Sequence, residues 1–114
     1  MDKINVFKTY LNKFVKLTDA EFDQTLLPII KIREFGKKEK LTKVGEVENY
    51  LNFIVKGLIR KFYKKGTQEI ITQISSEGHI IHCQESFHSR QPSEYIVETI
   101  EPSIVISIKY DELE

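Results

Sequence analysis

The sequence lacks several features that would narrow its function at once. Its 114 residues include one cysteine, three prolines and no tryptophan. A single cysteine cannot form an internal disulfide bond, which excludes a disulfide scaffold and fits a reducing compartment. No apolar run is long enough to span a bilayer, and the N-terminus lacks the basic and apolar regions of a secretory signal. We therefore expect a cytoplasmic protein with no membrane partner.

The charged residues balance overall but are unevenly distributed. Residues 1–67 hold 15 Lys and Arg against 8 Asp and Glu, whereas residues 68–114 hold 2 against 9. Opposite charge on the two halves favours attraction within the molecule over a surface for nucleic acid. The length, with 40% apolar and 30% charged residues, predicts a single globular domain over residues 1–114.

The N-terminal quarter of the chain has helical spacing. Apolar residues recur every three or four positions and predict an amphipathic helix from about residue 3 to 16, with its stripe at Ile4, Phe7, Leu11 and Phe14. Thr18 and Glu21 have the spacing of a capping box, which predicts a second helix that ends before Pro28. Its expected buried face consists of Phe22, Leu26 and Leu27. Both helices fall within about residues 3–27.

From about residue 29 the pattern changes to short runs rich in β-branched and aromatic residues, each closed by a turn signal. Lys65-Gly66, Glu77-Gly78 and Glu101-Pro102 are such turns. Alternating side chains predict that one face of each strand is buried. Eight strands are expected, at 29–35, 41–44, 50–55, 58–64, 69–74, 79–82, 95–100 and 104–110. Together they predict a mainly β fold, a jelly-roll-type double-stranded β-roll over about 29–110 with two short N-terminal helices.

Four segments carry a resemblance to a known family: residues 14–22, 44–60, 66–69 and 91–108. They resemble the N-terminal effector domain of the cyclic-AMP-receptor/Fnr family of bacterial transcription regulators, and more generally the cyclic-nucleotide-binding domain. The most specific part is the block of two strands joined at Gly57, where glycine permits a tight turn. The resemblance implies a regulatory domain that senses a small-molecule effector. It also implies a homodimer in a full-length protein, whose dimerisation helix and DNA-binding domain lie outside this chain.

The resemblance places a phosphate-binding cassette at residues 82–95. In nucleotide-binding members, a Gly-Glu pair and a later Arg hold the ribose and the cyclic phosphate. Aligned without gaps, these positions are His82-Cys83 and Ser93, followed by Glu94 and Tyr95. A buried phosphate without its Arg loses about 1.5–3 kcal/mol. We therefore expect a diverged cassette that does not bind cyclic AMP in the usual way.

A relocated arginine is the alternative that keeps cyclic nucleotide as a ligand. Arg90 lies three residues before the expected position and could replace the family Arg. No other cofactor is expected. The candidate pocket residues are Cys83, Gln84, Glu85, Ser86, Arg90, Ser93, Glu94 and Tyr95.

Other chemistries are weaker at this segment. His79, His82 and His88 lack the close spacing of a metal site, although His82 and Glu85 leave a cupin-like metalloprotein open. Cys83 is either a redox-sensing thiol or a small buried residue. We find no catalytic constellation, so we expect no enzyme. The remaining alternative is a stand-alone protein-interaction module, with the β-roll as scaffold and the N-terminal helices as the contact.

Overall fold

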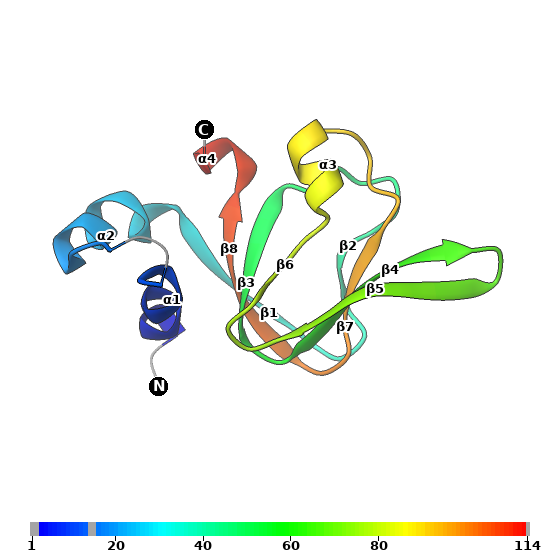
Figure 1. The fold of residues 1–114 in the computed structure, drawn as a ribbon, viewed down its shortest axis with the longest axis horizontal. Coiled ribbons are helices and arrows are strands. Elements are labelled where there is room, and N and C mark those ends of the chain that lie inside the picture. Colours follow the sequence, from blue (N-terminus) through cyan, green and yellow to red (C-terminus); the bar gives the residue numbers. More distant parts are fainter. Residues whose placement is uncertain (1–2, 14–15, 114) are drawn as a thin grey trace.

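The computed structural model describes residues 3–13 and 16–113 (Figure 1). Two helices and a short 3-10 turn precede the strands: α1 (Lys3–Leu11), α2 (Asp19–Thr25) and η1 (Leu27–Ile29). The strands are β1 (Ile30–Phe35), β2 (Lys40–Thr42), β3 (Tyr50–Lys56), β4 (Leu58–Lys65), β5 (Gln68–Ser76), β6 (Ile80–Ile81), β7 (Ile96–Thr99) and β8 (Ser103–Lys109). Helix α3 (Gln84–Ser89) lies between β6 and β7, and α4 (Tyr110–Leu113) follows β8. Within the described residues no helix is long and apolar enough to cross a membrane.

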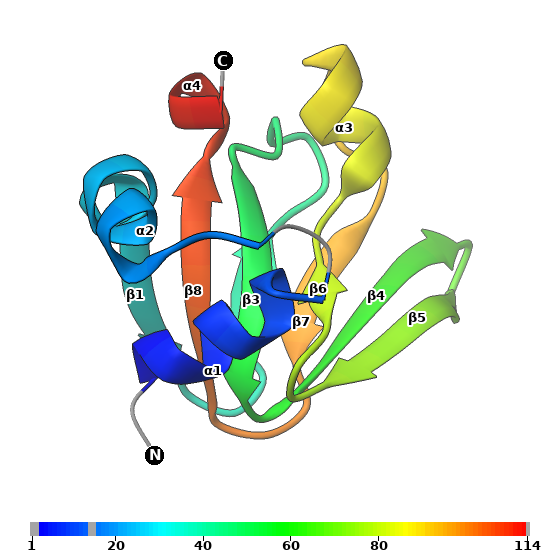
Figure 2. The ribbon, with the colours of Figure 1, turned by 60° about the vertical axis from the view of Figure 1, so that its left-hand side comes forward.

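The strands form two four-stranded antiparallel sheets, in the orders β1-β8-β3-β6 and β2-β7-β4-β5. All eight predicted strands are present with boundaries shifted by a few residues, which confirms the mainly β roll and its helical N-terminal attachment. Strands β4 and β5 extend away from the roll as a long hairpin (Figure 1). Helix α1 crosses the outer face of the sheet that contains β3 and β8 (Figure 2).

Strands β3 and β8 are buried on both faces, so the expectation of one buried face per strand is wrong for them. Consecutive residues Asn52, Phe53 and Ile54 are all inaccessible to solvent. Ile54 joins a core cluster between the two sheets, whereas Phe53 packs with Phe7 of α1 and Phe22 of α2. The N-terminal helices therefore give this sheet a second apolar layer, which alternation within a strand does not reveal.

The capping box of α2 is confirmed in both directions. Thr18 Oγ1 accepts from the Glu21 N–H at 3.1 Å, and Glu21 Oε1 accepts from the Thr18 N–H at 2.9 Å. Helix α2 ends at Thr25, and Pro28 lies in the 3-10 turn that follows. This turn rotates Leu27 outward, so its expected burial is wrong: the side chain is 41% exposed.

Two further predicted boundaries differ. The first helix ends at Leu11 instead of continuing to about residue 16, and Phe14 lies outside the described residues. Strand β8 ends at Lys109, because Tyr110 already begins α4.

Gly57 makes the turn between β3 and β4 with φ of +119°. A Cβ atom there would lie 2.7 Å from Ser103 Cα, so both the backbone conformation and the close approach require glycine.

Candidate functional site

The cassette, defined as residues 82–95, covers one end of the roll and contains α3 (Figure 1). Helix α3 ends at Ser89 and is capped by Arg90, which adopts a left-handed φ of 59° and donates its N–H to the Ser86 carbonyl at 2.9 Å. The predicted residues Glu85 and Ser86 lie on α3, whereas Ser93 and Tyr95 lie in the loop that leads into β7.

Glu48, from the loop between β2 and β3, fixes the start of the cassette. One carboxylate oxygen accepts from the Cys83 N–H at 3.0 Å, and the other accepts from Thr42 Oγ1 at 2.9 Å. The Glu48 N–H donates to Ser86 Oγ at 2.9 Å. The Cys83 N–H of the cassette therefore already donates its hydrogen bond to a carboxylate of the protein itself.

The Glu48 side chain is buried, with 2% of the residue exposed. Burial raises the pKa of its carboxyl group, and the hydrogen bonds from Cys83 and Thr42 oppose that rise. Arg33 supplies a weaker opposing charge. Protonation of Glu48 is therefore easier in the folded chain than in water.

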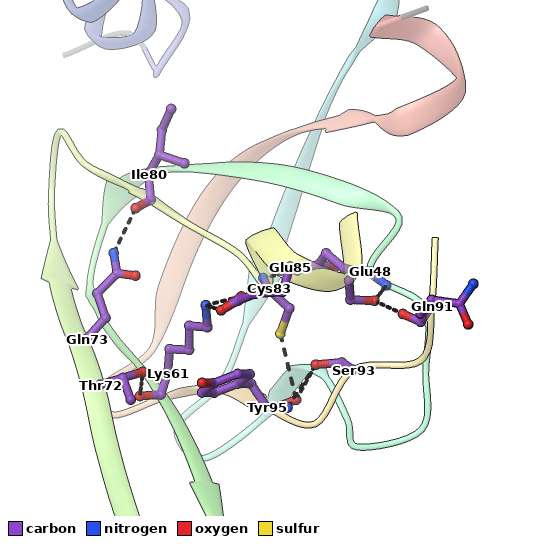
Figure 3. Close-up of polar contacts among 11 residues, drawn as sticks. Glu48, Lys61, Thr72, Gln73, Ile80, Cys83, Glu85, Gln91, Ser93 and Tyr95 are labelled. Carbon is purple, nitrogen blue, oxygen red and sulfur yellow. Dashed lines mark hydrogen bonds and ion pairs between the residues drawn. The ribbon is translucent and has the colours of Figure 1, made fainter. Parts of the chain in front are cut away.

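Lys61 of β4 points into the roll and reaches the cassette (Figure 3). Its ammonium lies 2.8 Å from Glu85 Oε1 and 4.6 Å from the centre of the Tyr95 ring. Its side chain is only 7% exposed, whereas that of Glu85 is 61% exposed. The hydrogen bond from Lys61 lowers the pKa of Glu85. The buried cation is therefore already neutralised by a side chain of α3.

Tyr95 fills the space beneath α3. Its ring meets that of Tyr63 edge-on at 5.6 Å, and it packs against the core cluster between the sheets. Its N–H donates to Ser93 Oγ, and its carbonyl accepts from Ser93 Oγ, both at 2.9 Å. Cys83 Sγ also points to this carbonyl at 3.7 Å. These contacts fix Tyr95, which lies two residues after the aligned arginine position.

A hollow of about 250 Å³, here called the cassette hollow, remains beside α3. Its lining includes the acidic residues Glu85 and Glu94 and the serines Ser86 and Ser93, and within the described part of the chain no Lys or Arg lines it. Ser93, which stands at the aligned arginine position, is buried. An anion placed in this hollow would meet two carboxylates.

Arg90 is not among the residues that line the cassette hollow, and its side chain is engaged elsewhere. Its guanidinium donates to the carbonyl of Glu48 at 2.9 Å, to the carbonyl of Phe87 at 3.0 Å and to Asn49 Oδ1 at 2.6 Å. It also stacks on the Tyr110 ring at 3.8 Å. A role in binding phosphate would require Arg90 to leave all these partners.

His82 and Cys83 are both buried at the entrance to α3. Burial is the main cause that lowers the pKa of His82 to about 4 and raises the pKa of Cys83 to about 11. The His82 ring packs edge-on against Phe87 at 5.0 Å. His79 is exposed and apart from this pair. The side chains described hold no group of three His, Cys, Asp or Glu residues that could bind a metal ion.

The sequence interpretation missed Glu48, Lys61 and Tyr63. Lys61 carried one signal, because it alternates with neighbours in a strand that has a buried face. The contact of Glu48 with Cys83 carried none, because it joins residues 35 positions apart in the sequence.

The sequence matches no protein-family model and no curated protein. Solved structures match the fold. The sensor domain of the transcriptional regulator DNR from Pseudomonas aeruginosa superposes with a TM-score of 0.79 at 16% identity, over 98% of this chain and 77% of that chain. The Thermus thermophilus catabolite activator protein superposes with a TM-score of 0.74 at 17% identity, over 88% of this chain and 46% of that one. Cyclic-AMP-bound PfPKA-R superposes with a TM-score of 0.78 at 11% identity, over 97% of this chain and 40% of that chain.

These identities establish the fold alone. The chain has the fold of a cyclic-nucleotide-binding domain and of Crp/Fnr-type sensor domains, which confirms the resemblance seen in the sequence at that level. It spans less than half the length of the Thermus and PfPKA-R chains.

Proposed function

We propose that the chain is the effector-sensing domain of a Crp/Fnr-like bacterial transcription regulator, with a cassette that has diverged from cyclic AMP. The domain binds a small-molecule effector and performs no catalysis. DNA binding and homodimer formation belong to the full-length protein, in segments outside this chain. The shared fold supports the regulatory role, and the contacts of the cassette support the divergence.

One observation supports the proposed divergence from cyclic AMP: side chains of the protein itself already contact the cassette residues. The Lys61 ammonium is 2.8 Å from Glu85, and Tyr95 lies beneath α3. A cyclic phosphate would have to displace these groups and then meet a hollow with carboxylates and no cation in its lining. Both steps disfavour binding, because the ion pair of Lys61 with Glu85 must be broken and no Lys or Arg among the described residues lines the hollow.

The contacts of α3 with the end of β8 support a route for the signal. Tyr110 begins α4, and its ring packs on Phe87 at 5.2 Å and on the Arg90 guanidinium at 3.8 Å. A ligand that favours one position of α3 would therefore also favour one position of α4. Any segment that continues from α4 would be coupled to the cassette in the same way.

The divergence is tested by calorimetric titration of the purified chain with cyclic AMP and cyclic GMP. We expect no saturable heat at millimolar nucleotide, for the wild type and for Arg90→Ala. The matched control is Lys37→Ala, which removes an exposed charge with no ion pair among the described residues. Circular dichroism establishes that each variant is folded.

Saturable micromolar binding by the wild type would overturn the divergence. If Lys37→Ala kept that binding and Arg90→Ala lost it, Arg90 would be the relocated phosphate ligand. The regulatory role is tested separately by sequencing the gene downstream of the codon for residue 114. A reading frame that continues beyond residue 114 into a winged helix-turn-helix supports it, and a frame that codes for no DNA-binding domain contradicts it.

A protein-interaction module is the second candidate, and exposed apolar residues favour it. Ile71 and Ile74 of the edge strand β5 are 47% and 55% exposed. An exposed apolar edge strand is a ready surface for another chain. This surface differs from the N-terminal helices that the sequence suggested as the contact.

A further inference from the structure

A second hollow lies across the start of β7, between the ends of β2 and β4. It is an open groove of about 780 Å³, here called the lysine groove, and is about three times the volume of the cassette hollow. This volume lies within the range of small-molecule sites, about 300–1,000 Å³. Tyr95 and Glu94 line both hollows, so the groove and the cassette meet at these residues.

The groove gathers positive charge. Lys40, Lys43 and Lys64 line it, and among the residues that the structure describes Glu94 is the only acidic one that does. All three lysines are exposed, and their ammonium groups form no ion pair or hydrogen bond with the residues that the structure describes. Lys61 and Arg60 of the same sheet, in contrast, are paired with carboxylates. The charges of the groove are therefore available to an anion.

The remaining wall of the groove is apolar and aromatic. Tyr63 and Tyr95 form an edge-on pair at 5.6 Å, and Ile96 is buried beside them. Val44 is 56% exposed at the rim, which is high for an apolar side chain. Apolar walls with a few charged groups are typical of sites for amphipathic small molecules.

We propose that the lysine groove binds a small amphipathic anion, with an aromatic or acyl body against the two tyrosines and a carboxylate, sulfonate or phosphate group near the lysines. That this ligand acts as an effector rests on the proposed function. That the groove binds it does not depend on the proposed function. Tyr95 connects the two sites, because it lines the groove, its ring lies 4.6 Å from the Lys61 ammonium, and its carbonyl accepts from Cys83 Sγ. A ligand in the groove would therefore bias the cassette without entering it.

Anilinonaphthalenesulfonate, a fluorescent aromatic anion, is the probe that tests the groove. Phenylnaphthylamine is its neutral analogue and shows how much of the binding needs the charge. The groove variant is the triple substitution Lys40→Gln, Lys43→Gln and Lys64→Gln. The matched control, Lys31→Gln, Lys56→Gln and Lys109→Gln, removes the same charge from exposed positions that do not line the groove.

We expect the wild type to bind one anilinonaphthalenesulfonate molecule, more tightly than phenylnaphthylamine and more weakly as salt increases. Exposed ion pairs change affinity by about 1.4- to fivefold each, so the groove variant should bind the anion about three- to a hundredfold more weakly. The control variant should stay within about twofold of the wild type. Near-ultraviolet circular dichroism excludes binding by a loosened core.

Equal affinity for the neutral analogue would overturn the inference, and so would equal losses in the two triple variants. Either result would leave the cassette titration and the reading frame unchanged, so failure of the groove is distinguishable from failure of the proposed function. Conversely, if the wild type and the groove variant both bound cyclic nucleotide, the proposed divergence of the cassette would be overturned. The proposed anion site in the groove would not be affected.

Discussion

Substitution of Glu48 by alanine should destabilise the fold more than substitution of an exposed carboxylate does, because the buried Glu48 side chain holds the cassette to the roll. The change removes the acceptor of the Cys83 N–H and that of the Thr42 hydroxyl. A stranded buried donor costs about 1–3 kcal/mol, and the hydroxyl can turn to another acceptor. Release of a buried carboxylate offsets part of the loss, so we expect the free energy of unfolding to fall by roughly 1–3 kcal/mol.

Urea unfolding followed by circular dichroism measures this loss as a shift of the midpoint at unchanged slope. The control is Glu46→Ala, which removes an exposed carboxylate that accepts only from the Lys43 N–H at 2.9 Å. It should change the free energy of unfolding by no more than about 0.5–1 kcal/mol. Equal midpoints for Glu48→Ala and the wild type would refute the structural role of this carboxylate.

The same residue gives a dependence on pH with a defined sign. Burial raises the pKa of Glu48 above its ordinary value of 4.5, so the folded chain favours the protonated acid. This group therefore contributes stability below pH 4.5 and loses that contribution as pH rises through the raised pKa. The stability of the wild type minus that of Glu48→Gln should fall over this window. A difference that increases with pH would contradict the direction of the shift.

Three further outcomes are expected. Gly57→Ala should lower the free energy of unfolding by about 2 kcal/mol or more, because the added Cβ would overlap Ser103. The control Gly45→Ala, at a residue with φ of +90° and open space around it, should lower it by only about 1 kcal/mol. Similar urea midpoints for the two variants would contradict this. The Cys83 thiol, which is inaccessible and whose pKa burial raises to about 11, should react with Ellman's reagent far more slowly in the folded chain than in urea, and equal rates would place it at the surface. Thr18→Ala should cost about 1 kcal/mol through loss of the capping box, and an unchanged midpoint would show that the cap adds nothing.

The strands were predictable because their signal is local. Alternation and turn residues identified all eight, and Gly57 identified the tight turn between β3 and β4. Burial of both faces of β3 was not predictable in the same way. It depends on α1 packing against Phe53, and nothing within the strand indicates that a helix from the N-terminus covers it.

The site was predictable as a segment and not as a set of contacts. The resemblance located residues 82–95, but Glu48 and Lys61 reach them from 35 and 24 positions away in the sequence. The same limit applies to Arg90. Its charge suggested a ligand for phosphate, whereas its observed partners are the carbonyl of Glu48 and the ring of Tyr110. Such partners come from the topology of the roll, which spacing in one segment does not encode.

Hydrogen exchange of single amides tests the central claim, that the cassette is closed by its own side chains, most directly. The Cys83 N–H donates to Glu48 at 3.0 Å, and the Tyr95 N–H donates to Ser93 at 2.9 Å. Nuclear magnetic resonance should find both amides protected without ligand, and equally protected in millimolar cyclic AMP. Fast exchange of both amides in the free protein, with protection that appears only when nucleotide is added, would contradict the account.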